Sequence, residues 1–191
     1  MLKFRKMQIA DQAQVLAWRV KPDVARFMLT EVEFNLDKQL RWFERIQNSA
    51  ADEYWIIENN QKPIGVINLS EIDRINQHAT WGLYVGEEMH SPVGGMLPMY
   101  FYNYVFNRRD LNLHKLHGKV LDTNISMLRV HEVCGYRQVG IHRDHVLRDG
   151  RFHDVHVVEL LRADWLSRTA RFGKMVAQFE DACGDSRSLP A

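Results

Sequence analysis

The sequence lacks the features that mark several large protein classes. Cysteine occurs only at Cys134 and Cys183 among 191 residues, without the paired spacing of a zinc or redox motif. Such sparse cysteine suits a reducing compartment. No apolar run is long enough to span a bilayer, and the N-terminal segment turns polar too early for a signal peptide. We therefore expect a cytoplasmic protein that does not bind membranes.

The sequence also lacks an excess of either basic or acidic residues. The chain has 25 basic and 24 acidic residues, for a formal net charge of +1. No overall field therefore favours nucleic acid or an anionic membrane surface as a partner. Hydrophobic residues make up 46% of the chain and charged residues 26%, as in globular proteins. No repeat or linker is visible, so we expect one domain over residues 1–182 and a disordered tail over 183–191.

Apolar residues alternate with polar ones in some segments and recur at helical spacing in others. Together these patterns predict an α+β fold. Asn35 and Asn124 are expected N-caps, Gly135 is an expected helix stop, and Pro98 fits only in the first turn of its helix. The expected strands cover residues 2–8, 53–59, 63–72, 79–86, 115–122, 137–147 and 152–161, and the expected helices cover 11–20, 35–48, 96–109, 124–135 and 163–182. Short polar turns between the strands predict a largely antiparallel sheet.

Two local motifs carry a family resemblance. A glycine turn follows the strand "WGLYVGE", and residues 124–136 read N-x-x-M-x-x-V-H-x-x-x-G-Y. The second motif is similar to the pattern N-x-x-A-x-x-L-Y-x-x-x-G-F of the GNAT acetyltransferases, and the order of elements also resembles that family over nearly the whole chain. The resemblance implies acetyl-CoA as cosubstrate, with no metal. It also implies one mixed sheet of about seven strands, splayed between the fourth and fifth strands.

A narrower resemblance is carried by "WRVKPDVARFMLTE", "LRWFERI", "YWIIENNQKPIGVINLSEID" and "LNLHKLHGKVLDTN". These stretches are similar to the flagellin-glycosylation acetyltransferases of pseudaminic acid synthesis. Those enzymes acetylate the 4-amino group of a UDP-linked 4-amino-4,6-dideoxy sugar. The resemblance therefore implies small-molecule substrates, namely acetyl-CoA and a nucleotide sugar.

The glycine turn is the expected pyrophosphate site. Helix N-terminal N–H groups favour an anion, and the backbone of Gly94, Gly95, Met96 and Leu97 can supply them. The alternative is a plain turn, since glycine is a common turn residue. The family loop usually reads R/Q-x-x-G-x-G/A, whereas this chain has Ser91 and Met96 at the first and last of those positions. We expect backbone contacts to survive and one side-chain contact to be lost.

The chemistry of acetyl transfer needs an oxyanion donor and a place for the thiolate. The resemblance assigns the donor and the backbone contact with pantetheine to Leu83 and Val85. It also places His131 at the position of the family's thiolate-facing tyrosine, where it is a candidate thiolate acid and CoA contact. Asn124 is expected to cap its helix and to lie beside the CoA arm. A helix histidine without a role is the alternative for His131.

The general base is not fixed by the motifs. Lys119 stands where many members of the narrower group carry a carboxylate. The amine of a sugar is only weakly basic, so a polar residue or a water chain is sufficient. The polar candidates nearby are Asn68, Ser70, Glu71 and Asp73, with Tyr84 on the next strand as a further catalytic candidate.

The acceptor is expected to bind near the first helices. In the family this region lines the acceptor pocket, and here it contains Trp18, Arg19, Arg26 and Met28. An arginine can hold a pyrophosphate in a bidentate manner. For Trp18 and Met28 the competing interpretation is core packing, and for Tyr84 it is an ordinary half-buried strand position.

Nine histidines invite a metal hypothesis. His142 with His145, and His153 with His156, are spaced i,i+3 in expected strands, which places paired rings on opposite faces. His114 and His117 share this spacing. We therefore expect no metal site.

Other interpretations stay open. A peptide or ribosomal-protein N-terminal acetyltransferase has a similar length and fold, and a non-catalytic CoA-binding or interaction protein would fit the altered loop. Cys134 has no visible His–Asp partner, which favours direct transfer over an acetyl-enzyme. A homodimer is a further possible state.

Overall fold

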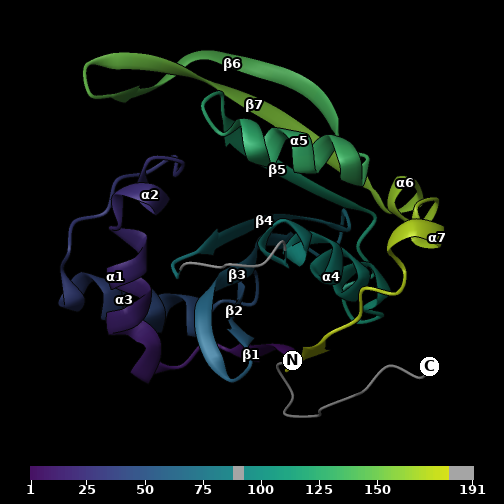
Figure 1. The fold of residues 1–191 in the computed structure, drawn as a ribbon, viewed down its shortest axis with the longest axis horizontal. Helices are drawn as coiled ribbons and strands as arrows, with labels where there is room; N and C mark the ends of the chain where they lie inside the picture. Colours follow the sequence, from purple (N-terminus) through teal and green to yellow (C-terminus); the bar gives the residue numbers. More distant parts are fainter. Residues whose placement is uncertain (88–92, 181–191) are drawn as a thin grey trace.

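Eight strands form one mixed sheet in the order β6-β7-β5-β4-β3-β2-β1-β8. The structure is a computed structural model that describes residues 1–87 and 93–180 (Figure 1). Ser91 and the expected tail at 183–191 lie outside these residues. The strands are β1 (Leu2–Lys6), β2 (Glu53–Asn59), β3 (Lys62–Asp73), β4 (His78–Val85), β5 (Lys115–Leu121), β6 (Arg137–Arg148), β7 (Arg151–Leu161) and β8 (Gln178–Phe179). The helices are η1 (Ile9–Asp11), α1 (Gln12–Arg19), α2 (Pro22–Ala25), α3 (Leu36–Gln47), α4 (Val93–Asn107), α5 (Ile125–Cys134), α6 (Arg162–Leu166) and α7 (Thr169–Phe172).

The pairing of β4 with β5 is short. These parallel strands pair only from His78 with Lys115 to Thr80 with His117, although β4 continues to Val85 and β5 to Leu121. β5 instead pairs along its whole length with β7. The sheet therefore opens between its fourth and fifth strands, as expected, and the α+β fold is confirmed.

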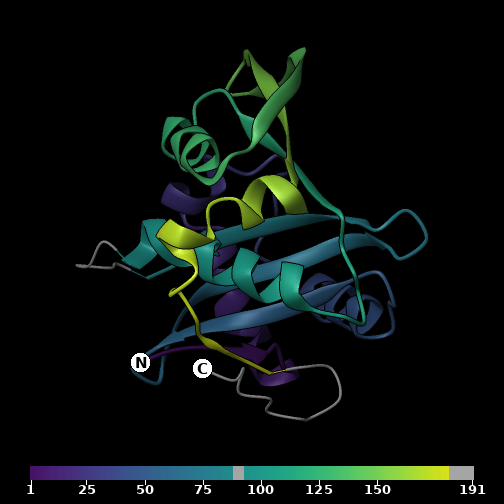
Figure 2. The ribbon, with the colours of Figure 1, turned by 90° about the vertical axis from the view of Figure 1, so that its right-hand side faces the viewer.

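Helices cover both faces of the sheet and bury two separate cores. One core joins the sheet to α4 and α5 and includes Trp55, Phe101 and Leu116. The other joins it to α1 and α3 through Val15, Trp18 and Phe43. Figure 2 shows α4 in front of the sheet, with α1 and α3 behind it. The alternation of strand side chains thus assigns each residue of β4 to one of two chemically distinct faces.

The expected helix caps are confirmed. The Asn35 side chain accepts a hydrogen bond from the Lys38 N–H (2.9 Å), and the Asn124 side chain accepts one from Met127 N–H (3.2 Å). Gly135 ends α5 with φ of 93°, a left-handed conformation that glycine adopts without strain.

Two helix predictions were wrong in extent. Helix α4 spans Val93–Asn107 rather than 96–109, so Pro98 lies inside the helix and not in its first turn. The expected last helix, 163–182, is divided into α6, α7 and the short strand β8. Tertiary packing overrides helical propensity there, because Phe179 is buried and stacks on Phe4 (4.1 Å) and Tyr104 (3.9 Å).

The expected separation of His142 and His145 was also wrong. Their rings stack at 4.8 Å. The register of β6 against β7 shifts between His142 and Val146, and Asp144 there has φ of 48°. A bulge of this kind breaks the alternation on which the prediction relied.

Trp18 packs directly on Gly86, immediately after β4. A Cβ at Gly86 would lie 2.0 Å from the Trp18 Cγ atom. Trp18 is 1% exposed, and its Nε1–H donates to the Glu87 carboxylate at 2.5 Å. The pair fixes the position of Gly86 and Glu87 directly after β4.

Replacing Gly86 by alanine is expected to destabilise the fold. Overpacking against Trp18 should cost about 1–3 kcal/mol of unfolding free energy, measured by urea denaturation. Gly95→Ala is the matched control, because a Cβ at Gly95 meets nothing within 4 Å. Equal unfolding midpoints for the two variants would contradict this account.

Candidate active site

The opening between β4 and β5 exposes backbone polar groups. The Gly86 N–H donates to the Ile64 carbonyl at 2.8 Å. Antiparallel strands alternate the direction of their backbone groups, so the even-numbered residues of β4 bond to β3. The N–H and C=O groups of Trp81, Leu83 and Val85 therefore point into the opening, past the last pair with β5. An extended ligand can pair with this free edge, and Leu83 and Val85 are two of the residues predicted to hold CoA.

The start of α4 carries the predicted anion site. Because α4 begins at Val93, its free N–H groups belong to Val93, Gly94 and Gly95. The N–H groups of Met96 and Leu97 take positions that bond within the helix, so these two residues lose the predicted phosphate contact. Gly95 is exposed and faces open space, whereas Leu97 is fully buried. The glycines therefore leave room for a phosphate at the free amides.

His131 is buried beside the opening. It is 4% exposed, and neither ring nitrogen has a hydrogen-bond partner among the described residues. Its ring lies 5.7 Å from that of Trp81 and 4.3 Å from that of Tyr136. Burial lowers the pKa of His131 from 6.5 to about 4, so the imidazole is neutral near pH 7.

Two tyrosines extend this cluster of unpaired polar groups. The hydroxyls of Tyr102 and Tyr136 are buried and lie close to one another, and burial raises the pKa of both phenols. Tyr102 also packs edge-on against Trp81 at 5.1 Å. Buried polar atoms without partners are costly.

The opposite face of β4 carries the other predicted catalytic residues. Asn68 donates through Nδ2 to the Ser70 hydroxyl at 2.7 Å. Asn68 pairs with Gly82 and Ser70 with Thr80, and Tyr84 lies on the same face, half-buried against the α1–α3 core. Burial raises the pKa of Tyr84, so its phenol stays protonated. The structure thus brings Asn68, Ser70 and Tyr84 together.

The expected carboxylates are less well placed. Both oxygens of Asp73 accept hydrogen bonds within the β3–β4 turn, from the Ile75 and Asn76 N–H groups and the Asn76 side chain. Glu71 lies in the irregular stretch of β3 with φ of 53°. Lys119 is exposed on β5.

Arg19 presents an unpaired cationic group on this face. Its Nη2 donates to the Thr30 carbonyl at 2.7 Å, but Nη1 is buried without a partner among the described residues. Burial lowers the pKa of Arg19, the nearby Tyr84 raises it, and Arg148 lowers it. A guanidinium in this state is ready to accept an anion.

Trp18, Arg26 and Met28 are the other residues predicted to bind the acceptor. Their surroundings differ from those of Arg19. Trp18 is in the core, as its alternative interpretation held. Arg26 is exposed and lies 3.3 Å from Asp23. The Met28 carbonyl accepts from Arg148 Nη2 at 2.6 Å.

Sequence reasoning missed the contribution of the β6–β7 hairpin. Arg148, at its tip, also donates to the carbonyls of Ala25 (3.2 Å) and Arg26 (2.8 Å) and so fastens the hairpin to the end of α2. His153 on β7 lies 3.2 Å from the Asp122 carboxylate. No local motif signals these contacts, because they join a hairpin at the edge of the sheet to segments far away in the sequence.

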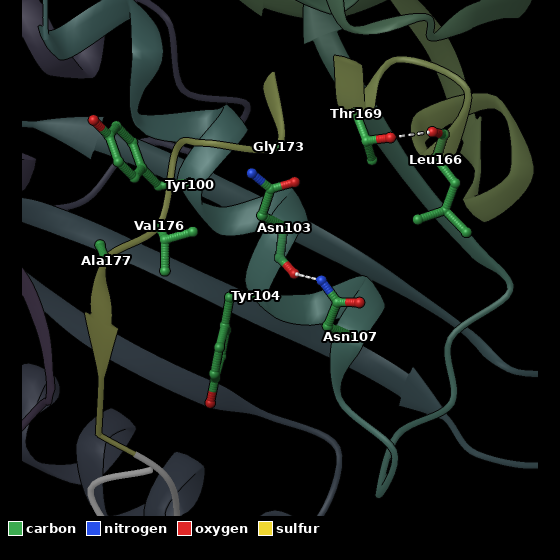
Figure 3. A pocket seen from close by; sticks show the side chains of 9 residues that line it. All are labelled: Tyr100, Asn103, Tyr104, Asn107, Leu166, Thr169, Gly173, Val176 and Ala177. Atoms are coloured by element: carbon green, nitrogen blue, oxygen red, sulfur yellow. Dashed lines mark hydrogen bonds between the residues drawn. The ribbon is translucent and has the colours of Figure 1, made fainter. Parts of the chain in front are cut away.

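A separate pocket of about 270 Å³ lies between α4 and the C-terminal segment (Figure 3). Asn103 is central to it, but its amide donates to the Phe172 and Met175 carbonyls and accepts from Trp165. No carboxylate, histidine or cysteine lines this pocket. It therefore offers no chemistry comparable to that of the opening.

Residues 1–87 and 93–180 contain no group of three or more His, Cys, Asp or Glu side chains that could hold a metal ion. No helix within these ranges has the length and hydropathy needed to cross a bilayer.

A comparison with protein families agrees with three features of this site, namely the free edge of β4, the glycines of α4 and the Asn124 motif. The model of the acetyltransferase (GNAT) domain matches residues 1–137. The chain belongs to the GNAT acetyltransferase family. It is an acetyl-CoA-dependent N-acetyltransferase, and the sequence-based prediction of that activity is confirmed.

The similar proteins described next are not named as enzymes of pseudaminic acid synthesis, which the narrower resemblance implied. The chain is 27% identical to spermidine N(1)-acetyltransferase of Vibrio cholerae, over 77% of this chain and 85% of that protein. It is 25% identical to the probable N-acetyltransferase YjcK of Bacillus subtilis, over 71% of this chain and 91% of that protein. A crystal structure of the Vibrio cholerae spermidine N-acetyltransferase with CoA and spermine has a TM-score of 0.80 at 22% identity, covering 86% of this chain and 98% of that one.

The buried, neutral state of His131 predicts acid sensitivity. The unfolded chain binds a proton at this residue near pH 6.5, whereas the folded protein binds it only near pH 4. Folding stability should therefore fall as pH drops through this window, by about 3 kcal/mol at 1.36 kcal/mol per unit. His131→Phe should remove this part of the pH dependence, measured as the urea unfolding free energy at several pH values.

The comparison uses the slope against pH and not the absolute stability, because phenylalanine also alters packing. His131→Tyr serves as a second variant, because it replaces the imidazole with a phenol that does not titrate in this window. Identical pH dependence in the wild type and His131→Phe would show that His131 titrates normally in the folded state.

Proposed function

We propose that the enzyme transfers acetyl from acetyl-CoA directly to the 4-amino group of a UDP-linked amino sugar. The observation that carries this proposal is the buried, unpaired Nη1 of Arg19, with Arg148 close enough to lower its pKa. The unpaired Nη1 of Arg19 suits a diphosphate acceptor, and Arg148 adds positive charge nearby although its own donors are bonded to backbone carbonyls at the end of α2. A polycation there would meet repulsion from both.

A polyamine is the second candidate acceptor. It is supported by the two comparisons with spermidine N-acetyltransferase of Vibrio cholerae. Exposed carboxylates of Glu31 and Glu33 precede α3 and could attract a polyamine. Glu33 is paired with Lys38 at 2.8 Å, and Glu31 lies 3.5 Å from Arg148. These carboxylates are already partly neutralised, which favours the nucleotide sugar over the polyamine.

The proposed reaction uses groups on both sides of the opening. The neutral amine attacks the thioester carbon from the face of Asn68, Ser70 and Tyr84. The carbonyl oxygen becomes an oxyanion that the gap-facing N–H of Leu83 or Val85 can stabilise. The C–S bond then breaks, and the sulfur leaves as a thiolate. Positioning of the two substrates supplies much of the rate.

His131 has a changed role in this scheme. A neutral imidazole cannot deliver a proton as an acid of ordinary strength, so the predicted protonation of the thiolate by imidazolium does not operate near pH 7. A neutral ring N–H still donates a hydrogen bond to sulfur. We propose this hydrogen bond as the contribution of His131, in place of the family's tyrosine.

We also propose where the enzyme acts in the cell and that it associates with itself. We expect the enzyme to act in the cytoplasm, as sparse cysteine suggests. Self-association is supported by a dodecameric structure of the Vibrio cholerae enzyme at a TM-score of 0.75. It is also supported by the exposed apolar side chains on β6, at Val139, Ile141 and Leu147.

Replacing Arg19 by methionine tests the acceptor. The KM for a UDP-linked 4-amino sugar should rise about 10–100-fold, since one charge-assisted contact is worth about 1.5–3 kcal/mol. The KM for acetyl-CoA should stay unchanged. Arg26→Met is the matched control, because it removes the same charge from an exposed position. Initial rates with spermidine and with a peptide substrate complete the panel.

The outcomes of this panel separate the alternatives. Turnover of spermidine or of the peptide but of no UDP-linked sugar would overturn the proposed acceptor. Binding of acetyl-CoA by calorimetry without turnover of any amine would favour the non-catalytic alternative.

Direct transfer gives a further prediction. Cys134 is buried, and burial raises the pKa of its thiol to about 12, so it is not a ready nucleophile. Incubation with acetyl-CoA alone should leave the protein mass unchanged, and Cys134→Ala should retain turnover. A mass increase of one acetyl group that is lost in Cys134→Ala would overturn direct transfer.

A further inference from the structure

His117 occupies the point at which β4 and β5 separate. Its pairing with Thr80 is the last contact between the two strands. Paired residues of neighbouring strands share a face, so the His117 side chain lies on the side of Thr80 and Tyr84. The ring of His78 confirms this placement, since it lies 5.3 Å from the His117 ring at an interplanar angle of 68°.

The strand register places His117 one residue from Trp81, whose ring contacts His131. Trp81 follows Thr80 directly, and its ring contacts the buried His131 from the opposite face of the sheet. If His131 faces the sulfur, the thioester lies at the level of Trp81 and Leu83. Successive residues advance about 3.3 Å along a strand, so His117 is about one residue from this level. The His153–Asp122 pair lies further along, beyond the pairing of Leu121 with Val155.

The surroundings of His117 keep its ring available as a proton acceptor. The ring is half-buried, which lowers its pKa, and His78 on β4 and Lys115 on β5 lower it further. Glu71 on β3 and Glu159 on β7 raise it, and Glu159 is held by Lys115 at 2.8 Å. His78 itself lies 3.7 Å from Asp73 of β3. His117 is therefore neutral near pH 7 and titrates below its usual range.

His78 shares this face, but it lies two residues before the end of the β4–β5 pairing and 3.7 Å from Asp73. The remaining groups are less available as bases. Tyr84 keeps its proton, Asp73 is engaged in a turn, and Asn68 and Ser70 bond to each other. Among the described residues of this face, a neutral imidazole at the fork is the group best suited to accept a proton from an amine.

We propose that His117 is the general base of acetyl transfer. The amine nitrogen forms its bond to the thioester carbon, the C–S bond breaks, and its electron pair leaves with the CoA sulfur. The proton lost by the nitrogen passes to the His117 ring. His117 then releases it to solvent, from which the thiolate takes a proton, so the net products are the amide and CoA thiol. This inference rests on the proposed amine acetylation but not on which amine is the acceptor.

The test is the pH profile of kcat/KM for the acceptor. At pH 7 His117→Gln should lower kcat/KM about 10²–10⁴-fold, the usual contribution of a general base. The wild-type profile should bend at the pKa of His117 and again at the pKa of the acceptor amine, whereas the variant should show only the bend of the amine. The Kd for acetyl-CoA and the far-UV circular dichroism should match the wild type, and His117→Asn repeats the measurement with a shorter side chain.

His156→Gln is the matched control. His156 is on β7, and its ring lies 2.5 Å from Gln138 of β6. It pairs with Val120, which faces the α4–α5 core, so it lies on the face opposite His117. This variant should retain the wild-type profile.

The results distinguish this inference from the proposed acceptor. If the wild type acetylates a UDP-linked sugar and both His117 variants keep its rate and profile, the base assignment is overturned and the acceptor stands. If the wild type acetylates spermidine instead, the acceptor proposal fails and the same profiles with spermidine decide the role of His117. If the wild type acetylates no amine, both proposals are overturned.

Discussion

The early end of β4–β5 pairing is the constraint on which the site depends. Three residue pairs hold the strands together, and beyond Thr80 and His117 each strand follows a different partner. β3 holds β4 and β7 holds β5, so the sheet stays continuous while its centre opens. The opening leaves Trp81, Leu83 and Val85 with backbone groups that β5 does not pair and that an extended ligand can bind. The two sheet faces then supply different chemistry, with His131 on one and Tyr84 on the other.

Desolvation determines the chemical state of the groups around this opening. Burial keeps His131 uncharged and Tyr84 protonated, and it leaves part of the Arg19 guanidinium without a partner. Each condition weakens the folded protein slightly, because a buried polar atom forgoes its bonds to water. The fold tolerates these groups next to two large apolar cores. These groups are already in position before a ligand binds, so binding does not carry the free-energy cost of reorganising them.

Much of this arrangement could be predicted from the sequence, and the failures have physical causes. Local signals succeed at Asn35, Asn124 and Gly135, where a side chain or a glycine acts within one helical turn. They fail over 163–182, where stacking of Phe179 on residues far away in the chain replaces a helix by a strand. They also fail at His142 and His145, because a bulge changes the alternation. Arg148 was missed because it acts on carbonyls more than a hundred residues away in the chain.

The short strand β8 has a consequence for how the chain folds. It lies parallel to β1, and Phe4 pairs with Phe179 across nearly the whole length of the chain. Contacts between residues so far apart in sequence form late, because the long intervening chain loses entropy when its ends are brought together. During synthesis the outer edge of β1 therefore stays uncovered until residue 179 has left the ribosome, while the earlier strands can already pair.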